Sequence, residues 1–455
     1  MTKNLNPYIF RGYDIRGVVP DDINDQTAYW IGRGFGSKLR NLHKTKCVVG
    51  YDNRLSSPML HTSLIQGITE SGIDVFDLTL TTTPMYYFAC QFLKIDSGIM
   101  ITASHNPKDE NGFKFAFENY QNAKGQEIQD FYQFIMDGNF TTGNGTVQEI
   151  NVKNDYFAAI DNGLSFGNRR VKVVLDPGNG TTAILLEELY KRYPLDITII
   201  NGQSDGSFPN HHPDPSIESN LEQLKQAVLK EKADVGLAFD GDGDRVGIIS
   251  NSATFIPIDY YMIIIIRDII NKVSKKEFLF DVKCSKSLED EIIKLGGIPY
   301  CYRTGNSYTK AKVQELDLPF GGELSGHLYF RDRFLGFDSG LYAGLRLLEI
   351  LSRTDKSVDD LLDGIHRYYA TPEIKYPSSD DKKAAVIEQI KSYCQEKGYT
   401  INDIDGIRVT FDDGWAGVRM SNTGPNITSR FEATTKERLE AIKEEFETLI
   451  AKYNQ

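Results

Sequence analysis

The sequence is poor in cysteine. Its five cysteines are odd in number, are scattered over 455 residues and form no C-x-x-C pair. That pattern argues against both a disulfide framework and a structural zinc site. The five positions are Cys47, Cys90, Cys284, Cys301 and Cys394.

Long apolar runs are also missing. The most apolar stretch, Tyr260 to Ile266, is interrupted by Arg267 and Asp268, whereas a membrane span needs about 20 apolar residues. The segment from Met1 to Pro7 has no apolar core of the kind that a signal peptide requires. We therefore expect a buried helix around residues 260–266 and a cytoplasmic protein with no membrane partner.

Positive charge is in deficit. The chain has 51 Lys and Arg against 63 Asp and Glu, a formal net charge of −12. Such a surface repels the nucleic-acid backbone, so no nucleic-acid partner is expected. It repels phosphorylated small molecules as well. A site for one must therefore gather Arg, Lys, a metal ion or backbone N–H groups locally.

The remaining composition is that of an ordinary globular protein, with 40% hydrophobic and 25% charged residues. The length suggests three or four domains. Short β-branched runs at 47–51 and 98–102 predict buried strands, and a helical pattern at 59–71 lies between them. Alternating strands and helices predict a largely parallel sheet and an α/β class.

The same pattern recurs further along the chain. We expect three related α/β domains with mixed, mostly parallel sheets around a central cleft, followed by a small C-terminal α+β domain. The expected domains are residues 1–150, 151–255, 256–368 and 369–455. The predicted strands that follow the first domain are 171–175, 197–200, 235–239, 246–249, 277–282, 298–302, 406–411 and 429–433, and the predicted C-terminal helices are 383–397 and 436–453.

The strongest single motif is an aspartate triplet, Asp240, Asp242 and Asp244, spaced by glycines between two predicted strands. Glycine lets the backbone bend tightly, so three carboxylates can converge on one Mg²⁺ ion. A solvated turn is the plain alternative. A helix–loop–helix calcium site is excluded, because its sixth and twelfth positions would be Arg245 and Asn251 rather than Gly and Glu.

Ser104 follows the buried strand predicted at 98–102. A serine exposed on such a turn can act as a nucleophile or carry a phosphoryl group. Most serines of this kind only form turns, and the neighbouring His105 adds little. The catalytic interpretation depends on its combination with the aspartate triplet.

Two further loops carry polar groups. In the glycine-rich segment 321–327, Glu323, Ser325 and His327 could bind sugar hydroxyls and titrate near neutral pH, or could form a plain turn. In segment 419–425, a guanidinium, hydroxyls and an amide could cradle an oxyanion, or could form an ordinary Ser/Asn turn. The polar residues of that second segment are Arg419, Ser421, Asn422 and Thr423.

These four segments, with Phe10 to Gly17, resemble the alpha-D-phosphohexomutase superfamily and above all its bacterial phosphomannomutase/phosphoglucomutase branch. The resemblance covers nearly the whole chain. It implies that a phosphoserine passes a phosphoryl group to a hexose phosphate, giving a bisphosphorylated intermediate. That intermediate turns around and returns its other phosphate, which interconverts hexose 1-phosphate and hexose 6-phosphate of mannose, glucose or both.

The resemblance also implies roles for individual residues. Ser104, Asp240, Asp242 and Asp244 would bind Mg²⁺. The catalytic group would be Ser104, Lys114, His327, Arg245 and Arg16. Substrate would be bound by Lys283, Glu323, Ser325, Arg419, Ser421, Asn422 and Thr423. Phosphosugars would be the small-molecule partners, a hexose 1,6-bisphosphate would be the activator, and the protein would be a monomer or a homodimer.

Two departures from the pattern leave questions open. Gly424 stands where many relatives have Glu, and Asn306 lies in a segment where relatives often have His. Since Asn306 cannot titrate, the proton chemistry falls to His327 or to Lys114, if its pKa is lowered by neighbouring cations. The alternatives are a phosphoglucosamine mutase, an aspartyl phosphatase and a non-catalytic sugar-phosphate binder. The first is disfavoured because that branch typically has Gly where this chain has Asn422.

Overall fold

The structure is a computed structural model that describes residues 5–379, 381–421 and 424–455. The chain divides into two compact units. The first contains Met1–Ile258 with Ser325–Leu361, and the second contains Asp259–Leu324 with Leu362–Gln455.

The first unit begins with a six-stranded mixed sheet in the order β1-β5-β4-β2-β3-β6. Strand β2 is parallel to β3 and β4, whereas β5 is antiparallel to β4 and β1. The strands are β1 (Ile15–Val18), β2 (Lys46–Tyr51), β3 (Asp74–Leu80), β4 (Gly98–Ile101), β5 (Glu110–Ala116) and β6 (Val147–Glu149). The mixed, mostly parallel sheet agrees with the sequence prediction.

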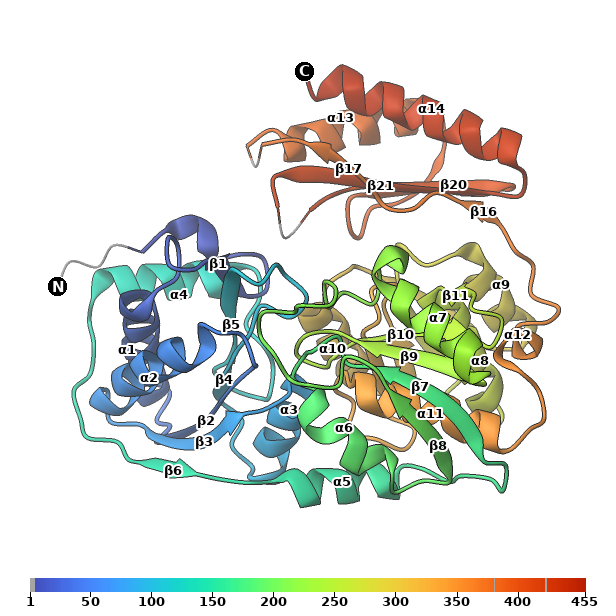
Figure 1. Ribbon diagram of the computed structural model, residues 1–455. Helices are drawn as coiled ribbons and strands as arrows, with labels where there is room; N and C mark the ends of the chain where they lie inside the picture. The colour runs from blue at the N-terminus through green and yellow to red at the C-terminus, as the bar shows by residue number, and fades with distance from the viewer. Residues whose placement is uncertain (1–4, 380, 422–423) are drawn as a thin grey trace. The chain divides into compact units, whose positions relative to one another are not determined.

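Helices cover both faces of this sheet. The helices are α1 (Asp25–Asn41), α2 (Ser57–Glu70), α3 (Thr83–Phe92) and α4 (Gln126–Asp137). Helix α1 packs against α2 and α4 on one face, and α3 lies on the other (Figure 1). Glycines bring α1 and α2 close together, because a Cβ on Gly32 would lie 2.2 Å from the Leu64 carbonyl oxygen. The helix predicted at 59–71 is confirmed as α2.

A second sheet in the first unit has the order β11-β10-β9-β7-β8. Its strands are β7 (Val171–Asp176), β8 (Leu195–Ile199), β9 (Val235–Phe239), β10 (Val246–Ser250) and β11 (Phe255–Ile256). The helices of this region are α5 (Lys153–Asn162), α6 (Ala183–Tyr190), α7 (Glu222–Glu231), α11 (Gly340–Ser352) and α12 (Val358–Leu361). Helices α7 and α11 both pack on the central strands, and α11 is buried along its whole length.

In the second unit, parallel strands form a sheet in which β12 lies between β13 and β14. These strands are β12 (Glu277–Asp281), β13 (Ile298–Tyr302) and β14 (Phe320–Gly322), and the helices are α8 (Ile258–Ile269), α9 (Lys286–Lys294) and α10 (Asn306–Glu315). Residues 261–266 of α8 are at most 2% exposed. The buried helix predicted there is confirmed.

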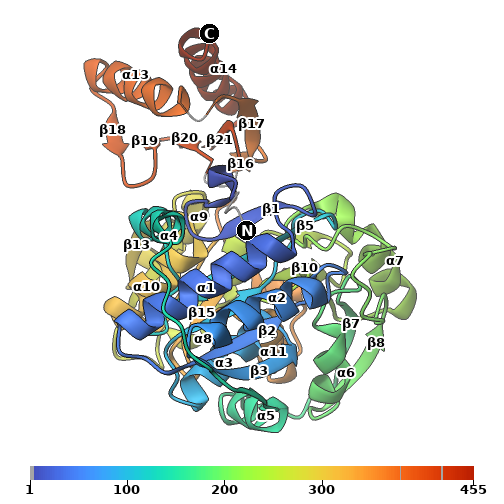
Figure 2. The same cartoon turned by 90° about the vertical axis from the view of Figure 1, so that its left-hand side faces the viewer.

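The C-terminal part of the second unit is an antiparallel sheet in the order β16-β21-β20-β19-β18, with β17 also paired to β21. The strands are β16 (Tyr369–Ala370), β17 (Ile374–Pro377), β18 (Thr400–Asn402), β19 (Ile407–Phe411), β20 (Gly414–Met420) and β21 (Asn426–Ala433). Helices α13 (Lys383–Glu396) and α14 (Lys436–Tyr453) cover one face (Figure 2). The predicted α+β arrangement is confirmed, although β16, β17, β18 and β20 were not predicted. Among the described residues, no helix combines the length and apolarity needed to cross a bilayer.

Candidate active site

Ser104 lies in the loop that follows β4 and is 1% exposed. Its backbone φ is +52°, a left-handed conformation that costs a non-glycine residue about 1–3 kcal/mol. The hydroxyl donates a hydrogen bond to Asp240 Oδ2 at 2.8 Å, and the backbone N–H donates to Thr102 Oγ1 at 2.8 Å. The strained backbone thus presents the Ser104 hydroxyl to the first residue of the aspartate triplet.

His105 lies beside this hydroxyl, with its Nδ1 3.2 Å from Ser104 Oγ. Burial lowers the pKa of His105 well below its usual value, and the charges of Arg245 and Arg16 lower it further. The imidazole is therefore neutral near pH 7. Because the Ser104 hydroxyl donates its proton to Asp240, its oxygen can only accept from His105 Nδ1 in the tautomer that carries a proton there.

The aspartate triplet forms the turn between β9 and β10, where Gly243 has φ +83°. Asp240, Asp242 and Asp244 are fully buried, and one carboxylate oxygen from each lies within 4.8 Å of the others. Burial and the two neighbouring carboxylates raise the pKa of Asp240 well above its usual value. Within the described residues, Asp242 Oδ1 accepts no hydrogen bond. A buried carboxylate oxygen without a donor fits a site for a divalent cation.

Lys114 projects from β5 into this triplet. Its Nζ lies 2.9 Å from Asp242 Oδ2 and 2.5 Å from Asp244 Oδ2. Burial opposes the charged form, but the two carboxylates outweigh burial and raise the pKa of Lys114 well above its usual value. The expectation of a lowered pKa for Lys114 is therefore wrong, because its immediate partners are carboxylates rather than cations.

Arg245 and His327 form a buried chain beside the triplet. Arg245 Nε donates a hydrogen bond to His327 Nε2 at 2.9 Å and lies 3.7 Å from Asp240 Oδ2. His327 Nδ1 lies 2.7 Å from Asp338 Oδ2. Because Nε2 accepts from Arg245, the ring proton of a neutral His327 belongs on Nδ1, facing Asp338. Sequence reasoning missed Asp338, whose position just before the helix-capping Ser339 gives no catalytic signal.

Arg16, on β1, contacts the same loop as Ser104. Its Nε donates to Asp14 Oδ2 at 2.7 Å, and its Nη1 donates to Asn106 Oδ1 at 2.6 Å and to the Ala103 carbonyl at 3.3 Å. Arg16 thus ties β1 to the two residues that flank Ser104 and His105.

Residues 240–245, the turn between β9 and β10 that carries the aspartate triplet, are here named the metal loop, and other contacts to them were not predicted. The Thr83 hydroxyl, at the start of α3, donates to Asp242 Oδ2 at 2.6 Å, and the Thr83 N–H donates to the Asp242 carbonyl at 3.0 Å. Thr181 N–H and Gly340 N–H donate to carbonyls of the two glycines in the loop, at 2.8 and 3.0 Å. Three segments distant in sequence therefore fix its backbone.

A second group of predicted residues lies in the second unit. Arg419 Nε, near the end of β20, donates to Asp405 Oδ2 at 2.9 Å. Lys283 Nζ is 3.4 Å from Glu373 Oε2, whose charge raises the pKa of Lys283 against the opposing effect of burial. Arg419 and Lys283 line one small cavity of about 20 Å³. Their carboxylate partners, Glu373 and Asp405, line the same cavity, so an anion that binds these cations must compete with both carboxylates.

The remaining predicted residues are placed as follows. Glu323 is 2% exposed, and its Oε1 accepts from Gly305 N–H at 3.1 Å and from Thr309 Oγ1 at 2.5 Å. Ser421 is 7% exposed and follows β20, and Ser325 is half-buried in the first unit. Asn422 and Thr423 lie outside the described residues.

Comparison with protein-family models decides the family. The models describe phosphoglucomutase/phosphomannomutase alpha/beta/alpha domain I, which matches residues 7–140, domain II, which matches 154–253, and domain III, which matches 257–368. The C-terminal domain of the same family matches residues 373–449. The chain belongs to the phosphoglucomutase/phosphomannomutase family. Three α/β/α domains and a C-terminal domain are thus confirmed, as is the resemblance to the phosphohexomutases.

Curated relatives of this family member agree along the whole chain. A phosphomannomutase/phosphoglucomutase of Pseudomonas aeruginosa is 40% identical over 96% of this chain and 94% of its own length. A phosphoglucomutase of Neisseria gonorrhoeae is 37% identical over 97% of this chain and 96% of its own. A solved family structure from Burkholderia thailandensis is 36% identical, has a TM-score of 0.91 and covers 98% of each chain.

Membership of this family and the buried aspartate triplet both indicate a site able to bind Mg²⁺. The family is generally magnesium-dependent, and the triplet supplies three converging carboxylates with an oxygen that lacks a hydrogen-bond donor among the described residues. Carboxylate oxygens are the ligands that Mg²⁺ prefers. This chain therefore has an acidic group able to bind that ion.

Proposed function

We propose that this protein interconverts hexose 1-phosphates and hexose 6-phosphates of mannose, glucose or both, through a phosphoserine at Ser104. The observation that carries this proposal is the buried Ser104 hydroxyl, 2.8 Å from Asp240 of the triplet. The names of the curated relatives, phosphomannomutase/phosphoglucomutase and phosphoglucomutase, support the same reaction. The alternative of an amino-sugar phosphate mutase has weaker support. A solved N-acetylglucosamine-phosphate mutase is only 13% identical to this chain.

The first half of the reaction would transfer the phosphoryl group from Ser104 to the substrate. A free hydroxyl of the hexose phosphate attacks phosphorus, the bond from phosphorus to Ser104 Oγ breaks, and the proton of the substrate hydroxyl passes through the site to Ser104 Oγ. The product is a hexose bisphosphate and a free Ser104. In the second half, Ser104 attacks the other phosphate, and the remaining hexose phosphate leaves with its phosphate at the other carbon.

The surrounding groups would position the reacting atoms and balance charge, which is most of what phosphoryl transfer requires. Asp240, Asp242 and Asp244, with Ser104 or its phosphate, would hold Mg²⁺, which supplies neutralisation of phosphate charge when bound. Lys114 would add positive charge beside Asp242 and Asp244, since carboxylates keep its ammonium protonated. Arg245 and Arg16 would add further positive charge near Ser104 and the aspartate triplet.

His327 would serve as the proton carrier of the site. Lys114 is not suited to that role, because its pKa is raised and its ammonium stays protonated. The His327 ring lies between Arg245, which donates to Nε2, and Asp338, whose Oδ2 is 2.7 Å from Nδ1. Proton exchange through His327 would require Arg245 to leave Nε2. A substrate phosphate would attract the Arg245 guanidinium and so draw it away from His327 Nε2.

Substrate recognition would fall to the other predicted residues. Arg419, Lys283 and Ser421, with Asn422 and Thr423, would hold the phosphate that is not being transferred. Glu323 and Ser325 would contact sugar hydroxyls. We also infer domain boundaries at 1–150, 151–255, 256–368 and 369–455, which the family matches at 7–140, 154–253, 257–368 and 373–449 support.

The deciding experiment compares wild-type enzyme with Ser104→Ala and with Ser252→Ala, an exposed serine between β10 and β11. Glucose 1-phosphate, mannose 1-phosphate and glucosamine 1-phosphate are assayed side by side, with Mg²⁺ and glucose 1,6-bisphosphate as activator. Intact mass and peptide mapping should find phosphate on Ser104 of the wild type and of Ser252→Ala. Phosphate on an aspartate, or turnover by Ser104→Ala, would instead indicate a phosphatase-like mechanism.

The sugar preference follows from the contacts proposed for Glu323 and Ser325. If they bind the 3- and 4-hydroxyls, which glucose and mannose share, kcat/KM for the two 1-phosphates should differ by less than about a hundredfold. Galactose 1-phosphate, inverted at carbon 4, should be a poor substrate. A larger ratio of kcat/KM between glucose 1-phosphate and mannose 1-phosphate would indicate a side chain that contacts the hydroxyl at carbon 2.

A further inference from the structure

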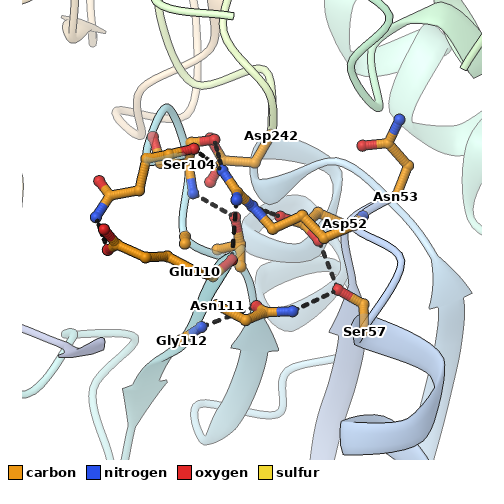
Figure 3. A network of polar contacts seen from close by, with 12 residues as sticks. Asp52, Asn53, Ser57, Ser104, Glu110, Asn111, Gly112 and Asp242 are labelled. Atoms are coloured by element: carbon orange, nitrogen blue, oxygen red, sulfur yellow. Dashed lines mark hydrogen bonds and ion pairs between the residues drawn. The ribbon is translucent and has the colours of Figure 1, made fainter. Parts of the chain in front are cut away.

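Arg54 is a buried arginine that does not belong to the predicted catalytic or substrate-binding residues. It follows β2, is 1% exposed, and stacks on Phe208 with its guanidinium carbon 5.4 Å from the ring centroid. Hydrogen bonds from Arg54 join the loop after β2 to the segment from Ser104 to Glu110. Figure 3 shows Asp52, Ser57, Ser104 and Glu110 of the surrounding polar network. A buried guanidinium is expensive to desolvate, so its partners indicate what it stabilises.

Those partners are four backbone carbonyls in residues 104–110, the segment that begins with Ser104. Arg54 Nη2 donates to the carbonyls of Ser104, at 2.9 Å, and Asn106, at 2.6 Å. Nη1 donates to the carbonyls of Pro107, at 2.6 Å, and Glu110, at 2.9 Å. One planar group therefore binds the loop at four points, including the carbonyl of the proposed phosphate carrier itself.

Asp52 sets the orientation of this guanidinium. Its Oδ2 lies 3.3 Å from Arg54 Nε, and its Oδ1 accepts from the Arg54 backbone N–H at 3.1 Å and from Ser57 Oγ at 2.7 Å. Asp52 is itself 1% exposed, so the pair is buried together. Arg54 Nε and Asp52 Oδ2 thus form a buried ion pair without a hydrogen bond between these two atoms, and Ser57 of α2 holds the carboxylate in place.

The Ser104 carbonyl is confined from a second direction. A Cβ added to Gly241 in the metal loop would lie 2.5 Å from the Ser104 carbonyl oxygen. Ser104 also has the φ of +52° noted above, a conformation that persists only where its surroundings hold it. Arg54 on one side and the metal loop on the other provide that constraint.

We propose that Arg54 is a positioning residue for phosphoryl transfer, which holds the Ser104 main chain in its strained conformation; this inference depends on the proposed function. Its charge also offsets the partial negative charge of four carbonyls near a site that must accept a dianionic phosphate. Lysine cannot replace it, because an ammonium has three donors and no planar fork to reach four carbonyls.

The test compares Arg54→Lys with Arg346→Lys. Arg346 is a matched control in the same unit, since it is also fully buried and uses both terminal nitrogens, on Asp332 at 2.9 and 2.8 Å. For each enzyme we would measure Tm, kcat and KM for glucose 1-phosphate. We would also measure by intact mass the rate at which glucose 1,6-bisphosphate phosphorylates Ser104.

We expect Arg54→Lys to lose about a hundredfold in kcat and in the rate of Ser104 phosphorylation, with KM within about threefold of wild type. Misplacement of a reacting group by about 1 Å can have an effect of that size. Arg346→Lys should lower Tm but retain kcat. Asp52→Asn keeps the Arg54 guanidinium but removes the charge that orients it, and should lose about tenfold in kcat. This second variant tests the proposal if Arg54→Lys does not fold.

Wild-type kcat in the folded Arg54→Lys or Asp52→Asn variant would overturn this role. So would an equal loss of kcat in Arg346→Lys at an equal loss of Tm, because the effect would then be a general loss of stability. If the wild-type enzyme itself carries no phosphate on Ser104, the proposed function fails first, and the role of Arg54 fails with it.

Discussion

Two of the predicted site residues, one in each unit, face opposite charges that follow later or earlier in the chain. Lys114 of β5 meets Asp242 and Asp244 of the metal loop, and Arg419 of β20 meets Asp405 of the loop before β19. Removing one partner of a buried ion pair destabilises a protein by about 3–5 kcal/mol, because the other charge stays buried and unpaired. Variants of these residues must therefore be judged by folding as well as by turnover.

For Arg419, replacement by alanine should lower kcat/KM by roughly ten- to a hundredfold or more in both directions of the reaction. The reason is that hydrogen bonds to a charged group contribute about 1.5–3 kcal/mol each. Coupled assays from the 1-phosphate and from the 6-phosphate would measure the loss. Arg438→Ala, which removes a surface arginine paired with Asp413, is the control and should leave kcat/KM unchanged. Unchanged kinetics in Arg419→Ala would show that this guanidinium does not touch substrate.

His211 offers a prediction on pH and stability. Its Nε2 lies 3.0 Å from Asp176 Oδ2; burial of the imidazole lowers its pKa, but Asp176 outweighs burial and the net pKa is raised. Protonated His211 thus stabilises the folded state at pH values below its unfolded pKa of about 6.5. That contribution is lost as the pH rises through the higher folded pKa.

Denaturant unfolding from pH 5.5 to 8.5 would measure this effect as a fall in the free energy of unfolding. His211→Gln should remove the part of the fall that belongs to this pair. His43→Gln, at an exposed histidine in the loop after α1, is the control and should keep the wild-type slope. A His211→Gln variant with the full slope would show that other groups produce it.

At the scale of elements, the hairpin of β9, the metal loop and β10 depends on close backbone contacts. The loop is bound by N–H groups of Thr83, Thr181 and Gly340, and Gly241 faces the Ser104 carbonyl. Because these are contacts to backbone, which cannot rotate away as a side chain can, the loop tolerates little added volume. Its glycines serve packing as well as the turn itself.

Gly241→Ala should therefore lower both stability and turnover. The new methyl group would lie 2.5 Å from the Ser104 carbonyl oxygen, and overpacking of this kind typically costs about 1–3 kcal/mol. Tm and the rate of Ser104 phosphorylation would measure the two effects. Gly202→Ala is the control, since Gly202 is exposed and its added Cβ would meet only the side chain of Ile199. Equal behaviour of the two variants would contradict the close approach.

At the scale of the whole molecule, metal binding should couple to folding. Three buried carboxylates at one turn repel one another, and a bound cation relieves that repulsion in the folded state only. A ligand that binds the folded state alone stabilises it by RT ln(1 + [L]/Kd), about 2.7 kcal/mol at a hundredfold excess over Kd. Mg²⁺ should therefore raise Tm, and chelation with EDTA should reverse the rise and abolish turnover.

Asp242→Asn should lose most of this Mg²⁺-dependent rise in Tm, because it removes a carboxylate whose Oδ1 lacks a donor among the described residues. Asp196→Asn, an exposed aspartate of β8, matches the change in charge and should keep the full rise. A rise in Tm that persists in Asp242→Asn would place the metal elsewhere.

The sequence by itself determined several of the elements and indicated the candidate chemistry. Local patterns predicted the strand around Cys47 to Tyr51, the buried helix around 260–266 and the final helix from Lys436 to Tyr453, and each is confirmed as β2, α8 and α14. The reason is that strand and helix periodicity are properties of neighbouring residues. The motifs also indicated the family, since their residue types are set by the chemistry.

Only the tertiary structure decided which side chains meet. Thr83 and Asp242 are 159 residues apart, and Arg54 and the Ser104 carbonyl are 50 apart, so no local pattern joins them. The pKa of Lys114 was expected to fall and is raised instead, because the sheet places its ammonium between two carboxylates. Periodicity selects the strand on which a residue lies, whereas the charge facing that residue depends on strand order and loop packing, which contacts distant in sequence determine.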